Sequence, residues 1–279
     1  MKNIDNVHHW DIDSLEYSEI YRDLRSWANT SGFRIMKREI LNHFKTFEKI
    51  RFVELGAGIG KMSILMNILG GKTTLIDYNK SAIEQAEKAQ RFFGCAPEFL
   101  LENALALPQS IYGQYDVVMS FGVAEHFLRK ERTAIFHSHH NLAKNNAMVI
   151  IWVPNAFGLC YRVSHGIRKA LGKWPKGLTE VPFTRKELKS IASKVGLKNI
   201  KTFCGGRFLR DFNYFLVSNL SEAIRKYLLR KKDERPLLHI EDNPREKLEE
   251  IMSHNETAQG FLDKYFSYPL FLIAFKSDY

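Results

Sequence analysis

The sequence predicts an α/β fold in which a mostly parallel sheet carries helices on both faces. Three observations support this fold class. Short apolar runs alternate with helix-like patterns from residue 51 to residue 203. A glycine-rich turn joins the first of these runs to the first helix, and a last apolar run, PLFLIAF, lies at 269–275. Alternation of this kind is typical of doubly wound sheets.

Each element follows from its local pattern. We expect helices over 14–27 and 31–47, ahead of the sheet. The alternating part predicts strand 51–55, helix 60–69, strand 73–77, helix 80–93, strands 97–100 and 115–120, helix 130–143 and strand 147–153. Thr184 followed by Glu187 is a capping box, so a helix is expected over 184–195, ending at Gly196. Strands 198–203 and 269–275 complete the sheet.

Two stretches exceed this minimal fold, residues 155–181 and residues 204–267. Connections this long inside a compact domain are usually functional. We expect both to form a helical cap over the carboxyl ends of the strands, where open α/β sheets bind their ligands. The predicted organisation is an N-terminal helical lid (1–50), a core (51–203, including the insertion 155–181), a helical insertion (204–267) and a final core strand (268–279).

The glycine-rich turn predicts a nucleotide-type cofactor site. Residues 51–63 read RFVELGAGIGKMS, with Gly56, Gly58 and Gly60 between strand and helix, and the next strand ends at Asp77. Glycines let the backbone approach a ligand, and a helix N-terminus favours an anionic group such as a carboxylate. An acid roughly 20 residues beyond the first glycine is placed to bind ribose hydroxyls.

The spacing of the turn distinguishes between cofactors. A dinucleotide-binding turn needs a small third residue that packs the helix under a pyrophosphate, and Lys61 occupies that position here. Glu54, two residues before the first glycine, would repel a pyrophosphate. Its charge suits the cationic ammonium and sulfonium groups of S-adenosylmethionine (SAM). An oxidoreductase is therefore disfavoured.

Three further segments join the glycine turn: LLENALALP (100–108), QYDVVMSFGVAEHF (114–127) and NLAKNNAMVIIWVPN (141–155). Together they resemble the class I SAM-dependent methyltransferases, and most closely the small-molecule branch that includes ubiquinone and menaquinone biosynthesis enzymes. The resemblance covers residues 30–155, and more weakly 181–200 and the last ten residues. It implies a Rossmann-like sheet of seven strands with the last one antiparallel, SAM as cofactor and S-adenosylhomocysteine (SAH) as product.

The resemblance also implies the cofactor residues. The turn would contact the methionyl part through its backbone, Asp77 the ribose, Tyr78 the adenine face, and the end of strand 115–120 the methionyl ammonium. Asn103 stands where the family commonly has an Asp that accepts from the adenine amine, and its amide oxygen can still accept. The predicted set is Glu54, Gly56, Ala57, Gly58, Asp77, Tyr78, Asn103, Ala104, Ser120 and Phe121.

Glu125 and His126 are the predicted catalytic residues. Methyl transfer from a sulfonium is an in-line displacement, and a hydroxyl or ammonium acceptor must also lose a proton. An imidazole is the natural base, and the neighbouring carboxylate could orient it or the substrate. Members of the family with this pair place it beside the transferred methyl. Tyr17 and Tyr21, in the predicted lid, are expected near the substrate, with packing of their helix on the core as the alternative.

The amino-acid composition limits where the protein can be located and what it can bind. Lys and Arg exceed Asp and Glu by 41 to 31, a net charge of +10, so an anionic partner or a solvated surface are both open. Three scattered cysteines and the lack of an apolar leader or an 18-residue apolar run predict a cytoplasmic protein with reduced thiols. No metal site is expected, because His137, His139 and His140 lack acidic or cysteine companions and are interpreted as a solvated helix face.

The expected cap is unevenly charged. Between 155 and 186 the only acid is Glu180, against the basic residues Arg162, Arg168, Lys169, Lys173, Lys176, Arg185 and Lys186. The segment 212–232 has a basic amphipathic pattern, which would lie on an anionic membrane surface or pack its apolar face on the core. A peripheral membrane location and the oligomeric state stay open.

Three functions remain. The leading one is methyl transfer to an O, N or C atom of a small molecule that is anionic or lipid-linked. The second is an RNA or other nucleic-acid methyltransferase, motivated by charge alone. Against it, residues 120–123 read SFGV in place of the (Asp/Asn/Ser)-Pro-Pro-(Tyr/Phe) loop used on base amines, and no RNA-binding module is appended. The third is a SAM-binding protein without transfer activity.

Overall fold

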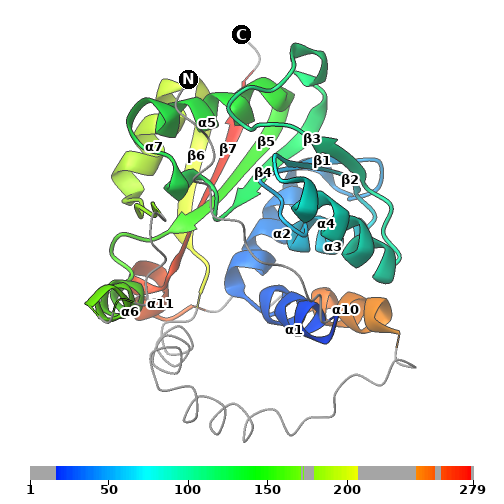
Figure 1. Cartoon of the computed structure of the whole chain (residues 1–279), viewed down its shortest axis with the longest axis horizontal. Helices are drawn as coiled ribbons and strands as arrows, with labels where there is room; N and C mark the ends of the chain where they lie inside the picture. The colour runs from blue at the N-terminus through cyan, green and yellow to red at the C-terminus, as the bar shows by residue number, and fades with distance from the viewer. Residues whose placement is uncertain (1–16, 171, 173–178, 207–242, 255–258, 278–279) are drawn as a thin grey trace, which may run out of the picture.

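A computed structural model describes residues 17–170, 172, 179–206, 243–254 and 259–277. It contains a seven-stranded sheet in the order β3-β2-β1-β4-β5-β7-β6 (Figure 1). The strands are β1 Arg51–Leu55, β2 Lys72–Asp77, β3 Glu98–Leu101, β4 Tyr115–Phe121, β5 Ala143–Pro154, β6 Leu197–Cys204 and β7 Pro269–Lys276. β7 runs antiparallel to both β5 and β6, and the pairs among β1 to β5 are parallel. The predicted fold class, with its antiparallel last strand, is confirmed.

Six helices agree with the predicted ones to within a few residues: α1 Tyr17–Ala28, α2 Ser31–Phe44, α3 Lys61–Ile68, α4 Lys80–Phe92, α5 Arg129–Leu142 and α7 Arg185–Lys194. Three more among the described residues, for which no bounds were predicted, lie in the two long stretches: α6 Leu159–Ala170, α10 Pro244–Ser253 and α11 Phe261–Phe266. Thr184 caps α7, its hydroxyl accepting from the Glu187 N–H at 3.1 Å. The pattern over 212–232 lies outside the described residues, and the division into lid, core and cap remains a prediction.

Alternating side chains of the strands divide the core into two layers. Phe52, Val117 and Ile150 pack with α2 and α3 on one face, and Val53, Val118 and Ile151 pack with α5 and α7 on the other. Neighbouring residues of a strand point to opposite faces, so a strand covered on both sides must be apolar throughout. β5 from Ala147 onward and β7 up to Ala274 are both of this kind. The late run PLFLIAF is apolar because β7 lies inside the sheet, between β5 and β6.

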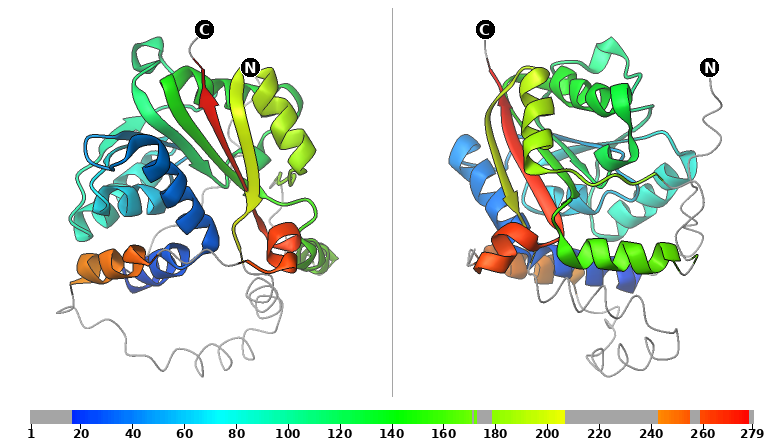
Figure 2. Two further views of the ribbon diagram at one scale, coloured as in Figure 1. Left: turned by 180° about the vertical axis from the view of Figure 1, so that it is seen from behind. Right: turned by 90° about the vertical axis from the view of Figure 1, so that its left-hand side faces the viewer.

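Two pairs of helices lie outside these layers, α1 beside α10 and α6 beside α11 (Figures 1 and 2). We call the edge of the sheet at which the parallel strands end the carboxyl edge, and ligands of such folds bind there. The last turn of α1 reaches this edge, where Trp27 packs on Trp152 and Phe121. α10 instead contacts Gly94, between α4 and the start of β3.

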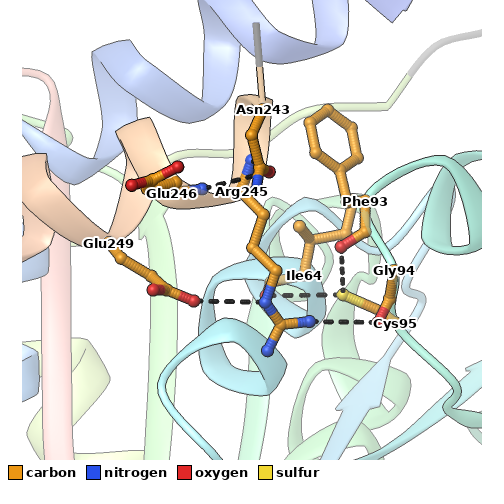
Figure 3. A network of polar contacts seen from close by, with 8 residues as sticks. All are labelled: Ile64, Phe93, Gly94, Cys95, Asn243, Arg245, Glu246 and Glu249. Carbon is orange, nitrogen blue, oxygen red and sulfur yellow. Dashed lines mark hydrogen bonds and ion pairs between the residues drawn. The ribbon is translucent and has the colours of Figure 1, made fainter.

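Helix α10 is fixed to the core by polar contacts at its first turn and by apolar contacts behind them. Figure 3 shows the Arg245 guanidinium donating to the Gly94 carbonyl at 3.0 Å and pairing with Glu249 at 3.1 Å. Leu248 is buried in the core. Cys95 lies beneath, and burial raises the pKa of its thiol to about 11, so it is unreactive at neutral pH. All three cysteines are buried thiols.

No helix among the described residues combines the length and the apolar character needed to cross a bilayer.

Candidate functional site

The glycine turn has one position that serves packing and one that faces open space. Gly56 and Gly58 both adopt left-handed backbone conformations, with φ of +61° and +54°. A Cβ on Gly56 would come within 2.8 Å of the Val123 side chain, so this glycine lets the turn after β1 touch the turn after β4. A Cβ on Gly58 would meet no atom of the described residues within 4 Å. Gly58 therefore borders a space that a ligand can fill.

Glu54 fixes the start of α3 from the neighbouring strand. Its buried carboxylate accepts from the backbone N–H of Ser63 at 2.9 Å and from the Ser63 hydroxyl at 2.6 Å. α3 is preceded by Gly60, which has no side chain to cap it, and Glu54 supplies the missing acceptor. Burial raises the pKa of Glu54 to about 7, partly offset by the two bonds from Ser63. Its contact with a methionyl ammonium stays a prediction.

Asp77 holds the glycine turn at the end of β2. One carboxylate oxygen accepts from the Gly58 N–H at 2.9 Å and the other from the Asn79 N–H at 2.9 Å. The next residue, Tyr78, is 46% exposed, as a ring that covers a ligand face must be before binding. Asn103 turns its amide oxygen to the Leu105 N–H at 2.9 Å, which leaves a second lone pair for a ligand.

Ser120 and His139 form a buried pair behind the end of β4. The Ser120 hydroxyl lies 2.8 Å from His139 Nε2, and His139 Nδ1 lies 2.7 Å from the Ile135 carbonyl. A carbonyl can only accept, so Nδ1 carries the proton and Nε2 accepts from the serine. Burial lowers the pKa of His139 to about 4.

The predicted solvated histidine face is therefore wrong for His139, which is fully buried. His139 follows Ile135 by four residues and Phe136 by three, so all three share the inner face of α5. His137 is exposed as expected. Within the described part of the chain, no three His, Cys, Asp or Glu side chains are grouped as metal ligands.

The predicted catalytic pair lies in a short 3-10 helix, Ala124–His126, directly after β4. His126 Nδ1 lies 2.7 Å from the Thr179 carbonyl, so Nδ1 is again the donor and the neutral ring keeps the lone pair of Nε2. The Glu125 carbonyl accepts from the Val181 N–H at 2.9 Å. The segment 179–183 thus crosses over the pair and orients the imidazole.

Glu125 is a carboxyl group in an unusual setting. It is 3% exposed, and none of the described groups forms a hydrogen bond with its Oε2. Burial raises its pKa to about 8; the negative charge of Glu180 raises it further and Arg132 lowers it. The group is therefore largely protonated at neutral pH in the ligand-free protein.

Arg132 holds the crossing segment in place. Its guanidinium donates to the carbonyls of Val181 at 3.0 Å and Pro182 at 3.3 Å, and pairs with Glu187 at 2.9 Å. The same group lies over the Phe183 ring, 3.5 Å from the ring centroid. A planar fork with several donors suits this position better than a lysine would.

Several residues that the sequence did not single out meet beside Glu125. The Tyr161 hydroxyl on α6 donates to Glu180 at 2.5 Å. The Tyr161 ring packs on Tyr268, with centroids 5.1 Å apart, and Tyr268 packs on Trp152 at 5.6 Å. Trp27 of α1 continues the row, 5.6 Å from Trp152 and 6.3 Å from Phe121. Trp152 is 9% exposed, and no described acceptor meets its Nε1–H.

Only one of these residues had a signal in the sequence. Glu180 is the single acid in a long basic stretch, which marks it as a charge with a local purpose. The rings come from four separate segments, so no local pattern joins them. Of the predicted lid residues, Tyr21 is buried in the core and Tyr17 stacks on Phe92 at 4.2 Å.

The arrangement fits a nucleoside-type cofactor on one side and an acceptor on the other. Gly58, Asp77 and Tyr78 offer open space, a carboxylate and an exposed ring at the ends of β1 and β2. Glu125 and His126 offer a buried carboxyl and an oriented base at the end of β4. Gly56 and Val123 are the point where the two sides touch.

A family model described as a methyltransferase domain matches residues 23–202. No match is found among curated proteins.

Solved structures share the fold at low identity. A proposed sarcosine dimethylglycine methyltransferase from Galdieria sulphuraria is 16% identical with a TM-score of 0.56, covering 98% of this chain and 92% of its own. Magnesium protoporphyrin IX methyltransferase from Synechocystis PCC 6803, with bound SAH, is 15% identical with a TM-score of 0.52, covering 94% and 84%. The cyclase SpnF is 12% identical with a TM-score of 0.53, covering 88% and 81%.

Proposed function

The chain belongs to the methyltransferase domain family, and on that premise we propose that it transfers a methyl group from SAM to a small molecule. The observation that carries the proposal is the contact between the two turns. Gly56 of the cofactor turn packs against Val123, and Glu125 and His126 follow two and three residues later. A cofactor bound at the glycine turn would therefore have the oriented imidazole as a near neighbour.

SAM supplies a methyl group bound to a positively charged sulfur. The lone pair of an acceptor atom attacks the methyl carbon in line with the carbon–sulfur bond, and the sulfur leaves. The residues of this chain position the two reactants and handle the proton. Asp77 and the backbone at Gly56 and Gly58 would hold the cofactor. His126 Nε2 would take the acceptor's proton, since Nδ1 is committed to the Thr179 carbonyl. Glu125, buried beside it, would contact the acceptor.

The finer assignments belong to this proposal. The two methyltransferase neighbours are named for sarcosine or dimethylglycine and for magnesium protoporphyrin IX, both small molecules, which supports a small-molecule acceptor here. A place in the ubiquinone-like branch, and with it contact with a membrane, would require a quinone or another lipid-linked acceptor. The neighbour SpnF is a cyclase, so the fold alone does not decide the reaction and transfer must be measured.

The test uses methyl-labelled SAM, the purified chain and an extract of its source cells, followed by partition of the products. Label in a small-molecule fraction, aqueous or organic, supports the proposal, and the organic phase would indicate a lipid or quinone acceptor. Label in nucleic acid, or tight SAM binding with no transfer, would overturn it. Exposed His137→Ala serves as the active control and His126→Ala as the expected inactive variant.

A further inference from the structure

A group of acidic and aromatic side chains, which includes Glu125 of the predicted catalytic pair, lies at the carboxyl edge. It consists of Glu125, Trp152, Tyr161, Glu180 and Tyr268, and we call it the acidic aromatic corner. An added Cβ on Gly122 would lie 3.4 Å from Glu125 Oε1 and 3.0 Å from the Trp152 ring, so the carboxyl and the indole flank one backbone position. Tyr161, buried on α6, presents Glu180 from the other side.

Two buried polar atoms of this corner lack partners among the described residues. They are Glu125 Oε2 and Trp152 Nε1, on side chains that are 3% and 9% exposed. Buried polar groups are nearly always hydrogen-bonded, and one left unpaired costs free energy. Glu125 Oε2 can accept a hydrogen bond from a ligand's N–H, and Trp152 Nε1 can donate to a separate accepting atom of the ligand. Both side chains lie beside Gly122 and next to the predicted base, and they indicate a position that a ligand completes.

The charge of the corner decides what kind of ligand this is. In addition to burial, the negative charge of Glu180 raises the pKa of Glu125, and burial and both carboxyl groups raise the pKa of Tyr161. Arg132, which lowers the pKa of Glu125, already serves Glu187 and two backbone carbonyls. An anionic acceptor would meet two carboxyl groups here, whereas a cation would relieve their repulsion.

The rings point in the same direction. Trp152, Tyr161 and Tyr268 form a continuous row beside the carboxyl groups. Aromatic faces attract cations, and indole does so most strongly. Rings beside carboxyl groups are the combination that recognises substituted ammonium groups.

We propose that the acidic aromatic corner binds a cationic amine, and that this amine is the methyl acceptor. The inference rests on the proposed function. An ammonium acceptor first gives a proton to His126 Nε2. The freed nitrogen lone pair then forms the bond to the methyl carbon, while the electron pair of the carbon–sulfur bond leaves with sulfur. Glu180 and Tyr161 are positioning residues that hold the charged end of the acceptor.

The test compares choline with its neutral isostere 3,3-dimethylbutan-1-ol on the full chain with SAH bound. The readout is the indole N–H resonance of Trp152, identified among the four tryptophans by its loss in Trp152→Phe. Choline should shift this resonance at millimolar concentration and the isostere should not. Glu180→Gln should weaken choline binding at least fivefold with SAH affinity unchanged, and exposed Glu131→Gln should leave both unchanged.

Tyr161→Phe is the second variant, since it removes only the hydroxyl that holds Glu180 and should also weaken choline binding. Equal binding of choline and the isostere, or tighter binding of propionate than of choline, would overturn the amine assignment. Failure of the proposed function would look different, because SAM would then not bind or no methyl would be transferred, whatever choline does.

Discussion

On the cofactor side of the carboxyl edge both buried carboxylates have partners, whereas on the acceptor side the buried carboxyl group keeps an oxygen with none among the described residues. Glu54 is bonded to Ser63, and Asp77 to the backbone of Gly58 and Asn79. Glu125 Oε2 is unpaired, and so is the N–H of its neighbour Trp152. The carboxylates of the first side are held in place before any ligand arrives, whereas the carboxyl group of the second is left for a ligand.

The difference follows from what each side is made of. The cofactor side uses backbone and short-range contacts within residues 54–79, so its geometry is fixed by the turn itself. The acceptor side brings together Trp27, Trp152, Tyr161 and Tyr268 on four segments. A side built from separate segments can change its ligand while the fold and the cofactor turn stay the same.

The largest expected effect comes from Gly58→Ala on the cofactor side. Its left-handed φ makes alanine cost about 1 to 2 kcal/mol, but the added methyl enters open space, so the fold should survive. Cofactor affinity should fall about a hundredfold, or about 3 kcal/mol, because that space is where the cofactor lies. Calorimetric titration with SAH measures it.

Gly56→Ala is the matched variant, with a similar φ and a clash at Val123 in place of open space. It should lower the free energy of unfolding by about 1 to 3 kcal/mol more than Gly58→Ala does. Undiminished SAH affinity in Gly58→Ala would remove the turn from the cofactor site.

The next largest effect is expected from Glu125, the carboxyl group of the acceptor side that has an unpaired oxygen. The pKa of Glu125 is about 8 in the folded protein, above the ordinary value of 4.5, so the folded state keeps a proton that the unfolded state loses. Glu125 therefore lowers the free energy of unfolding above pH 4.5, and this loss of stability grows as the pH rises to about 8. Glu125→Gln should be nearly neutral at pH 5 and stabilise the ligand-free protein by about 3 kcal/mol at pH 8.

Denaturant unfolding at several pH values measures this difference. Glu54 and His139 also have shifted pKa values, but both residues are present in the unmodified chain and in Glu125→Gln, so their effects cancel in the difference between the two free energies of unfolding. Exposed Glu131→Gln should show no pH-dependent change. A difference that stays flat between pH 5 and pH 8 would mean that Glu125 is not held in its neutral form.

Much of the fold could be predicted because its signals are local. The apolar runs of β5 and β7 and the left-handed glycines of the turn are each readable within a dozen residues. His139 shows where composition misleads: three histidines in four residues suggested a wet surface, whereas the spacing to Ile135 and Phe136 indicated the buried face. Trp152 and Tyr161 could not be assigned to the site from the sequence, because their place in it depends on contacts with residues that are distant in the chain.

A tenfold effect is expected for the base. His126→Ala should lower turnover at least tenfold, a loss of about 1.4 kcal/mol or more in transition-state stabilisation, with SAM affinity nearly unchanged. His126→Asn is the sharper variant, because its amide can still donate to the Thr179 carbonyl but cannot accept a proton. The assay uses the acceptor identified by label partition. Full turnover in His126→Asn would leave the imidazole only the task of holding the segment 179–183.

The smallest effect concerns the helix that joins the two sides. Lys61, the first residue of α3, pairs with Asp23 of α1, and both side chains are partly exposed. Pairs of this kind contribute about 1 kcal/mol at most and are screened by salt. Asp23→Asn should weaken SAH binding less than fivefold, and the difference should vanish near 1 M salt. Glu19→Gln breaks a pair within α1 alone and is the control. A larger loss confined to Asp23→Asn would mean that α1 closes on the cofactor as a lid, which would couple the cofactor side of the edge to the acceptor side.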